Sequence, residues 1–346
     1  MSYNSMSSWG QRSDDNWKRS PRADRRSAWK RDGEIPMPND DCYTSDGTAK
    51  KCIVSEFGNI AVRKKVTATS TCGNPPNRYC NRVTSPFGGE LKQCHVCDAN
   101  HKDRMYPADF IVDSNKKSCW LSRPFNDSSA NNRVSVTISL GKKYELTYII
   151  LPFCNKLPES MALFKSADFG RRWIPMQYYS SDCRGMYGLE ENGRITTSNE
   201  QAAVCKDIYS NTNVYSRPRV AFSLMEGRPS AHDLQNNPVL RDWVTVTDVR
   251  IVFDRLSAPN ELATEKESNY YSMSELTLGG RCKCNGHASK CITNADGSTR
   301  CECKHNTDGP DCDRCKDFHY DRPWSPATNE KANECVGKFI TSLFLS

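Results

Sequence analysis

Residues 282–335 read CKCNGHASKCITNADGSTRCECKHNTDGPDCDRCKDFHYDRPWSPATNEKANEC, and they hold eight of the 18 cysteines of this 346-residue chain. Aliphatic residues are scarce here, and a module of this size is hard to stabilise by burying apolar side chains alone. Two Cys-x-Cys pairs fit poorly to the C-x₂₋₄-C spacing of zinc ligands, whereas disulfides would use all eight cysteines and contribute roughly 2–4 kcal/mol each. The spacing therefore favours a small disulfide-bonded module over a zinc site.

The other ten cysteines lie between Cys42 and Cys205, so the total is even and the first 41 residues have none. An oxidising compartment explains this density more simply than metal or redox chemistry in the cytosol, and we expect nine disulfides. The chain has no apolar segment after a basic start, so no signal peptide is visible in it. We give the cysteines more weight than the missing leader and predict a secreted protein.

Residues 42–280 carry the alternation of apolar and polar side chains that is typical of half-buried strands. The alternation is clearest at residues 134–140 (VSVTISL), 144–151 (YELTYIIL), 244–253 (VTVTDVRIVF) and 274–278. Turn signals stand at Leu140-Gly141, Asn192-Gly193 and Pro259-Asn260, and no long amphipathic helix pattern interrupts them. We predict a mainly β fold, in which an antiparallel, jelly-roll-like β-sandwich is followed by the disulfide-rich module at 281–335.

The two ends of the chain differ from these domains. Residues 1–41 are polar and basic, with eight lysines and arginines between residues 11 and 31, and this composition predicts disorder. A solvated tail is the favoured interpretation, and a tether to acidic glycans or phosphates is the alternative. Residues 336–346 form an apolar tail that is too short to span a bilayer, and we assign it no function. Nowhere does the chain contain a run of 18 apolar residues, so no membrane span is expected, and the net charge of +7 does not by itself indicate nucleic-acid binding.

Several motifs carry a resemblance to a known family. The eight cysteine spacings, with CKHNT at 303–307 and Gly309-Pro310, resemble a laminin-type EGF-like module, and FHYDRPW at 318–324 resembles the first such module of the netrin family. Upstream, further stretches resemble the laminin N-terminal domain of netrins: TCGNPP at 71–76, CHVC at 94–97, SLGKK at 139–143, PESMA at 158–162, GRPSAHD at 227–233 and PVLRDWVT at 238–245. The resemblance implies a laminin N-terminal domain at 42–280 and an EGF-like module at 281–335. It does not extend to 1–41 or 336–346, and the further EGF-like modules and basic C-terminal domain of that family do not follow in this sequence.

The same resemblance implies a complete disulfide pattern. In the sandwich it implies the pairs Cys42–Cys52, Cys72–Cys97, Cys80–Cys94, Cys119–Cys154 and Cys183–Cys205. In the module, where the family pairs cysteines first to third, second to fourth, fifth to sixth and seventh to eighth, it implies Cys282–Cys291, Cys284–Cys301, Cys303–Cys312 and Cys315–Cys335.

A structural calcium site is the one metal site that the resemblance implies. Its oxygen ligands would be the Phe110 carbonyl, the Asp113 carboxylate, Ser118 and a carbonyl from Ser274. The loop is shorter than in the family, has serine where threonine is usual, and carries Lys116 and Lys117, so a plain polar loop is the alternative. Separately, Asn126 begins the one Asn-x-Ser/Thr sequence, a predicted glycosylation site.

No catalytic motif accompanies these features, and we expect a binding protein rather than an enzyme. Residues 230–233 (SAHD) hold three triad residue types, but neighbours in sequence cannot supply triad geometry. The resemblance implies a secreted guidance cue of the extracellular matrix or basement membrane, with DCC/neogenin-type receptors, Uncoordinated-5-type receptors and heparan sulfate proteoglycans as partners. The long polar loops 254–269 and 184–200 are the expected receptor contacts. The alternative is a structural basement-membrane protein that associates through its laminin N-terminal domain.

Overall fold

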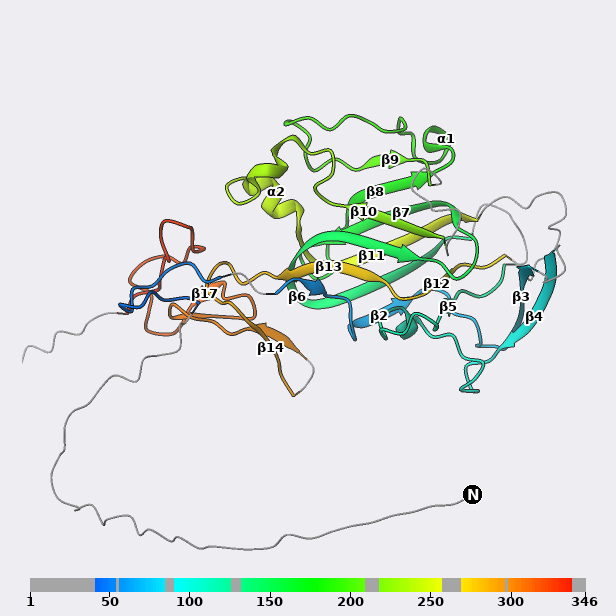
Figure 1. Cartoon of the computed structure of the whole chain (residues 1–346), viewed down its shortest axis with the longest axis horizontal. Coiled ribbons are helices and arrows are strands. Elements are labelled where there is room, and N and C mark those ends of the chain that lie inside the picture. The colour runs from blue at the N-terminus through cyan, green and yellow to red at the C-terminus, as the bar shows by residue number, and fades with distance from the viewer. Residues whose placement is uncertain are drawn as a thin grey trace, which may run out of the picture. The chain divides into compact units, whose positions relative to one another are not determined.

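A computed structural model describes residues 41–53, 56–84, 90–125, 132–208, 218–256, 269–295 and 298–337 (Figure 1). The predictions for residues 1–40, for Asn126, for the turn at Pro259-Asn260 and for most of the tail fall outside these ranges. Within them, none of the helices has the length and apolar character needed to cross a membrane.

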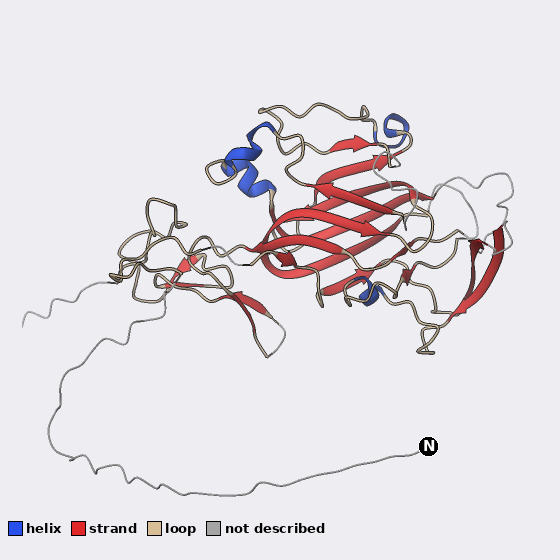
Figure 2. Cartoon of the chain, viewed as in Figure 1, coloured by secondary structure: helices blue, strands red, loops and turns tan. Residues whose placement is uncertain are grey.

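Strands dominate the described chain, and the helices are single turns or little more (Figure 2). The strands of the sandwich are β1 (Gly58–Asn59), β2 (Lys65–Ala68), β3 (Asn77–Thr84), β4 (Glu90–Cys97), β5 (Trp120–Leu121), β6 (Val134–Pro152), β7 (Pro158–Ser166), β8 (Ile174–Ser180), β9 (Val204–Lys206), β10 (Arg219–Ser223), β11 (Thr245–Leu256), β12 (Ser272–Met273) and β13 (Thr277–Cys282). The helices are η1 (Ala108–Ile111), α1 (Cys183–Tyr187), η2 (Pro229–Asp233) and α2 (Pro238–Trp243). The module contributes β14 (Cys291–Thr293), β15 (Thr299–Cys301), β16 (Thr307–Asp308) and β17 (Arg314–Cys315).

Strand β6 organises the sandwich because its two halves pair with different partners. The first half lies between β2 and β11, and the second half lies between β10 and β13. From β11 the sheet continues through β7 and β8, all antiparallel, to β9, which is parallel to β8. Inward positions alternate along β6 as the sequence pattern predicts, and their side chains enter one apolar core with those of β7, β10, β11 and β13. The predicted mainly β sandwich is confirmed.

The expected turn at Leu140-Gly141 is wrong, because residues 134–152 form one continuous strand. What the glycine provides is a change of register: Ser139 pairs with Asp248, and Tyr144 pairs with Val246. Gly141 has a φ of 82°, in the left-handed region that favours glycine, so the strand bulges here without reversing. The strand expected at 274–278 is also displaced, since Ser274 lies between β12 and β13.

Nine disulfides hold the chain, and no described cysteine is free. They are the pairs that the resemblance implies: Cys42–Cys52, Cys72–Cys97, Cys80–Cys94, Cys119–Cys154, Cys183–Cys205, Cys282–Cys291, Cys284–Cys301, Cys303–Cys312 and Cys315–Cys335. In the module, the buried cluster is mostly cystine: Cys284, Cys301 and Cys312 pack with Ala288.

Candidate functional site

The sandwich and the module meet at a polar junction built from three short segments. We call the contacts among Lys142, Lys143, Lys283, Asp311 and Asp313 the junction. Lys142 and Lys143 follow the bulge at Gly141 in β6, Lys283 follows β13 directly, and the two aspartates belong to the module. Cys282 pairs with Tyr144 in the sheet and is disulfide-bonded to Cys291, so the same residue ends the sandwich and begins the module.

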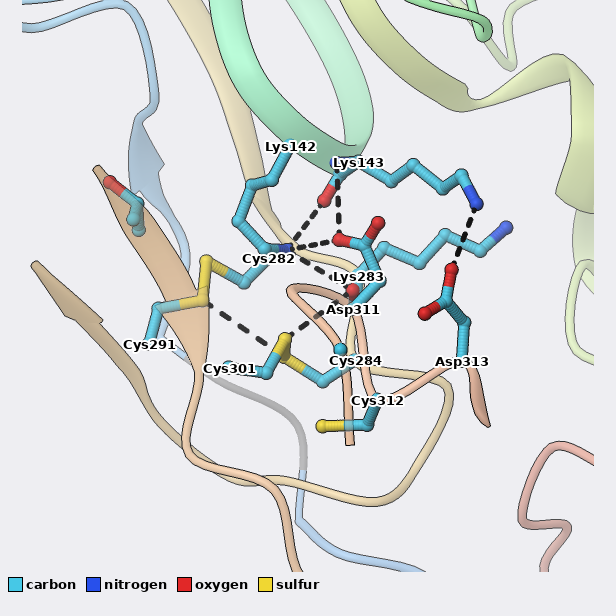
Figure 3. Close-up of polar contacts among 12 residues, drawn as sticks. Lys142, Lys143, Cys282, Lys283, Cys284, Cys291, Cys301, Asp311, Cys312 and Asp313 are labelled. Atoms are coloured by element: carbon cyan, nitrogen blue, oxygen red, sulfur yellow. Dashed lines mark hydrogen bonds and ion pairs between the residues drawn. A yellow bond between two sulfur atoms is a disulfide. The ribbon is translucent and has the colours of Figure 1, made fainter. Parts of the chain in front are cut away.

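Lys142 is the centre of the junction (Figure 3). Its ammonium lies 2.9 Å from Oδ1 of Asp311, and it donates hydrogen bonds to the carbonyl oxygens of Lys143 (2.8 Å) and Lys283 (3.2 Å). The two charged side chains are 0% and 4% exposed. Burial lowers the pKa of Lys142, while the carboxylate of Asp311 acts in the opposite direction. A buried pair with its hydrogen bonds satisfied tolerates loss of one partner poorly, because the other charge is left without compensation.

Further contacts fix Asp311 in place. The backbone N–H of Lys143 also donates to Oδ1 of Asp311 (3.2 Å), and the amide of Asn285 donates to the Asp311 carbonyl (2.9 Å). Nearer the surface, the Lys143 ammonium lies 3.4 Å from Oδ2 of Asp313. The sequence did show a signal for this contact: the alternation along β6 places Lys142 at an inward position, where a lysine needs a buried anion.

The first described segment also packs on the module. The N–H of Cys52 donates to the Gly286 carbonyl (3.0 Å), and Nε2 of His305 lies 3.1 Å from the Cys42 carbonyl. His305 faces a second buried histidine, with its Nδ1 3.0 Å from Nδ1 of His287. The pKa of His287 is lowered to about 4, mainly by burial, with the neighbouring His305 acting in the same direction and the hydrogen bond to the Ser325 carbonyl acting in the opposite one. The cystine loop at 42–52, which precedes the sandwich in the sequence, is therefore held against the module by hydrogen bonds.

The FHYDRPW stretch at 318–324 has an inner and an outer part. The indole N–H of Trp324 donates to the Cys312 carbonyl (3.0 Å), and its ring lies against His287. By contrast, Phe318 is 88% exposed and Tyr320 is 63% exposed. Two large aromatic side chains are thus presented to solvent from a backbone that disulfides hold.

The structure brings together only part of the predicted calcium site. Oδ2 of Asp113 accepts a hydrogen bond from the Ser118 hydroxyl (2.7 Å), and Oδ1 accepts one from the Asn115 N–H (2.8 Å). The segment that contains Ser274 lies beside the end of η1, because the N–H of Leu276, two residues further on, donates to the Ile111 carbonyl (2.8 Å). Phe110 lies in η1 just before Asp113. The donor types suit Ca²⁺, which prefers carboxylate, hydroxyl and carbonyl oxygens. The Asp113 carboxylate, however, already accepts hydrogen bonds on both oxygens from within its own loop.

The other predicted positions have simpler roles. Residues 184–200 begin in α1 and reach a turn at Asn192, where φ is 53°, while 257–268 of the other loop lie outside the described ranges. In the SAHD tetrad, Nδ1 of His232 contacts the Pro229 carbonyl and the N–H of Ser230 donates to Glu200. This tetrad forms part of η2, and no serine–histidine contact is found in it.

Comparison with known proteins assigns the class. The family of laminin N-terminal domains (domain VI) matches residues 53–280, and the laminin/attractin EGF domain matches residues 282–328. Since the first match covers more than half of the chain, the chain belongs to the laminin N-terminal domain family.

Individual relatives agree with this assignment. Laminin subunit gamma-1 of Xenopus tropicalis is 39% identical over 313 residues, covering 88% of this chain and 19% of the relative. Laminin subunit gamma-1 of Homo sapiens and laminin subunit gamma-3 of Mus musculus are each 40% identical, covering 86% and 85% of this chain and 19% of each relative. The chain thus spans about a fifth of the length of these relatives. A solved chitosan-binding module covers 65% of this chain at 13% identity with a TM-score of 0.34, which is too low to carry an argument.

Proposed function

We propose that the chain is a secreted guidance cue of the netrin type, which binds cell-surface receptors through its two domains. The observation that carries the proposal is the FHYDRPW stretch, which resembles the first EGF-like module of netrins and leaves Phe318 and Tyr320 exposed on a disulfide-held backbone. Exposed aromatic side chains on a rigid support are typical of residues that dominate binding energy at protein interfaces.

The remaining features fit this proposal. Nine disulfides suit an extracellular protein, and the location we propose is the extracellular matrix or basement membrane. The proposed partners are DCC/neogenin-type receptors, Uncoordinated-5-type receptors and heparan sulfate proteoglycans. The chain would act by binding and not by catalysis. Calcium would play a structural role at Asp113 and Ser118, joining the η1 loop to the segment at Ser274.

Binding to an immobilised DCC-family ectodomain tests the proposal. Wild type should bind saturably, and Phe318→Ala with Tyr320→Ala should weaken binding by about tenfold or more, since interface aromatics contribute roughly 2 kcal/mol or more when truncated. Phe169→Ala is the matched control, because Phe169 is also exposed (58%) and also has a positive φ, but lies on the sandwich. Equal loss in both variants, or no binding by the wild type, would contradict the proposal. Repeating the titration with a chelator tests the calcium site.

The second candidate is a structural basement-membrane protein that associates through its laminin N-terminal domain. The identity of 40% with laminin gamma subunits over both domains favours it. Sedimentation of the secreted chain, alone and with purified laminin, separates the two candidates. Calcium-dependent oligomers support association, and a monomer that binds receptor supports the guidance cue.

A further inference from the structure

The sequence contains two Asn-Gly pairs, Asn192-Gly193 and Asn285-Gly286, and the fold places them in different surroundings. An asparagine before a glycine is prone to lose its side-chain amide, because glycine has no Cβ to keep its backbone nitrogen away from the side-chain carbon of the asparagine. Both asparagines have φ in the left-handed region, 53° at Asn192 and 55° at Asn285. The surroundings of each pair therefore decide how freely it reacts.

The first pair is open. Asn192 lies on an exposed turn between α1 and β9, at one edge of the sandwich (Figure 1). Its side-chain amide donates to Oε1 of Glu191 (3.0 Å), an exposed residue whose place as acceptor water can take. In the described part of the chain we find no backbone hydrogen bond that holds the N–H of Gly193. A Cβ added at Gly193 would meet no atom closer than 3.8 Å, so the backbone has room to move here.

The second pair is held on both sides. The amide of Asn285 donates to the Asp311 carbonyl (2.9 Å), and the Asn285 carbonyl accepts the N–H of Ala327 (2.9 Å). A Cβ added at Gly286 would lie 2.9 Å from the Cβ of Ala327, and the Gly286 carbonyl accepts the N–H of Cys52 (3.0 Å). The side-chain carbon of Asn285 therefore cannot approach the next backbone nitrogen without breaking several contacts.

We propose that Asn192 is a modification site, at which the folded chain spontaneously converts asparagine into aspartate and isoaspartate. The N–H of Gly193 gives its proton to hydroxide, and the nitrogen bonds to Cγ of Asn192. The Cγ–Nδ2 bond breaks, and ammonia leaves with a proton from water. Water then opens the cyclic imide: cleavage of the bond from nitrogen to Cγ gives aspartate, and cleavage of the bond from nitrogen to the Asn192 carbonyl carbon gives isoaspartate. The net reaction consumes water and releases ammonia, so it needs no enzyme, metal or oxidant.

The new carboxylate would change the loop more than the domain. The contact between the side chains of Asn192 and Glu191 would then join two carboxylates, which repel each other. The backbone pairing of Glu191 with Cys205 lies directly beside this turn, and the Cys183–Cys205 disulfide closes the loop at both ends. Residues 184–204 should therefore loosen without unfolding of the sandwich. This inference goes beyond the proposed function, since the reaction needs no receptor.

Peptide mapping of the full chain tests the site, after incubation in water labelled with heavy oxygen and with all disulfides intact. The label enters the product carboxylate, and enzymatic methylation of isoaspartate identifies the second product. Asn192 should take up label faster than Asn285 by about tenfold or more, because the hydrogen bond and the packing of Asn285 must be broken before it reacts. The rate at Asn192 should rise with pH, since the attacking nitrogen must first lose its proton.

Gly193→Ala is the matched variant. The added Cβ fits, because the nearest atoms are 3.8 Å away and the φ of Gly193 lies outside the left-handed region, yet it keeps the nitrogen from Cγ of Asn192. Labelling of Asn192 should fall well below that of the wild type. After reduction and denaturation of the wild type, Asn192 and Asn285 should react at similar rates, because the fold no longer distinguishes them.

Two results would overturn the proposal: equal labelling of Asn192 and Asn285 in the folded chain, or the same difference between them in the denatured chain. Both comparisons use the wild type, so they hold even if Gly193→Ala does not fold. Hydrogen exchange of fresh and incubated samples then tests the effect on the loop. Exchange should become faster at 184–204 and stay unchanged in β7 and β11, and faster exchange throughout the sandwich would refute a change confined to the loop.

Discussion

The sandwich and the module are stabilised by different interactions. In the sandwich, large side chains such as Trp120, Phe253 and Tyr271 are almost fully buried and stack on one another, with ring centroids 4.9 Å apart for Phe253 and Tyr271. In the module, the buried cluster consists of cystines and one alanine. Apolar burial stabilises the first in proportion to area, whereas disulfides stabilise the second mainly by restricting its unfolded state. Different substitutions should therefore lower the stability of the two regions.

The largest effect is expected in the sandwich core. Phe253→Ala removes a ring that packs between Trp120 and Tyr271 and leaves a cavity, so the free energy of unfolding should fall by roughly 3–5 kcal/mol. Denaturant unfolding measures this change. Hydrogen exchange at 298–337 should stay as in the wild type, and a loss of protection there would show that the two regions are not independent.

At the junction, Lys142→Met leaves Asp311 buried without its cation. We expect a loss of about 3 kcal/mol and faster hydrogen exchange in both regions, because the pair belongs to both. The double variant Lys142→Met with Asp311→Leu should recover most of the stability, since it removes both charges. A double variant as unstable as the single one would refute the role of the ion pair.

Within the module, replacing Cys284 and Cys301 by alanine opens one disulfide. The expected cost is roughly 2–4 kcal/mol, confined to the module. Exchange at 298–337 should accelerate, while that of β7 and β11 should not change. Equally faster hydrogen exchange in the module and in the sandwich would show that this disulfide does not stabilise the module alone. The matched sandwich variant opens Cys183–Cys205 and should leave the module protected.

Acid should weaken the module by a smaller amount. The folded pKa of His287, about 4, lies below its ordinary value of 6.5, so the unfolded state binds the proton more readily between these values. Stability is therefore full above pH 6.5 and falls as pH decreases towards 4, by about 2 kcal/mol at pH 5. His287→Asn should flatten this part of the pH profile of unfolding. An unchanged profile would assign the acid sensitivity to other groups.

Local pattern predicted much of this structure, and the parts it missed depend on distant residues. Cysteine spacing indicated the disulfide-rich module, and alternation indicated the strands on each side of Gly141. Gly141 was misread as a turn because the same residue permits a reversal or a bulge, and pairing with β11 decides between them. The junction was missed since Lys142 and Asp311 lie in different domains, and only the folded chain brings the lysine to its carboxylate. The calcium ligands came from resemblance alone, and the structure joins two of them directly.

Cys282 ends β13 and begins the module, and this continuity has a mechanical consequence. Tension applied to the far end of the module enters the sandwich along the axis of β13. The hydrogen bonds between β13 and β6 run across that axis, so they share the load in shear and do not open one after another. The ammonium of Lys142 and the carboxylate of Asp311 form a second, non-covalent route for the same force into β6. Force applied to the module would thus reach the sandwich through both β13 and β6.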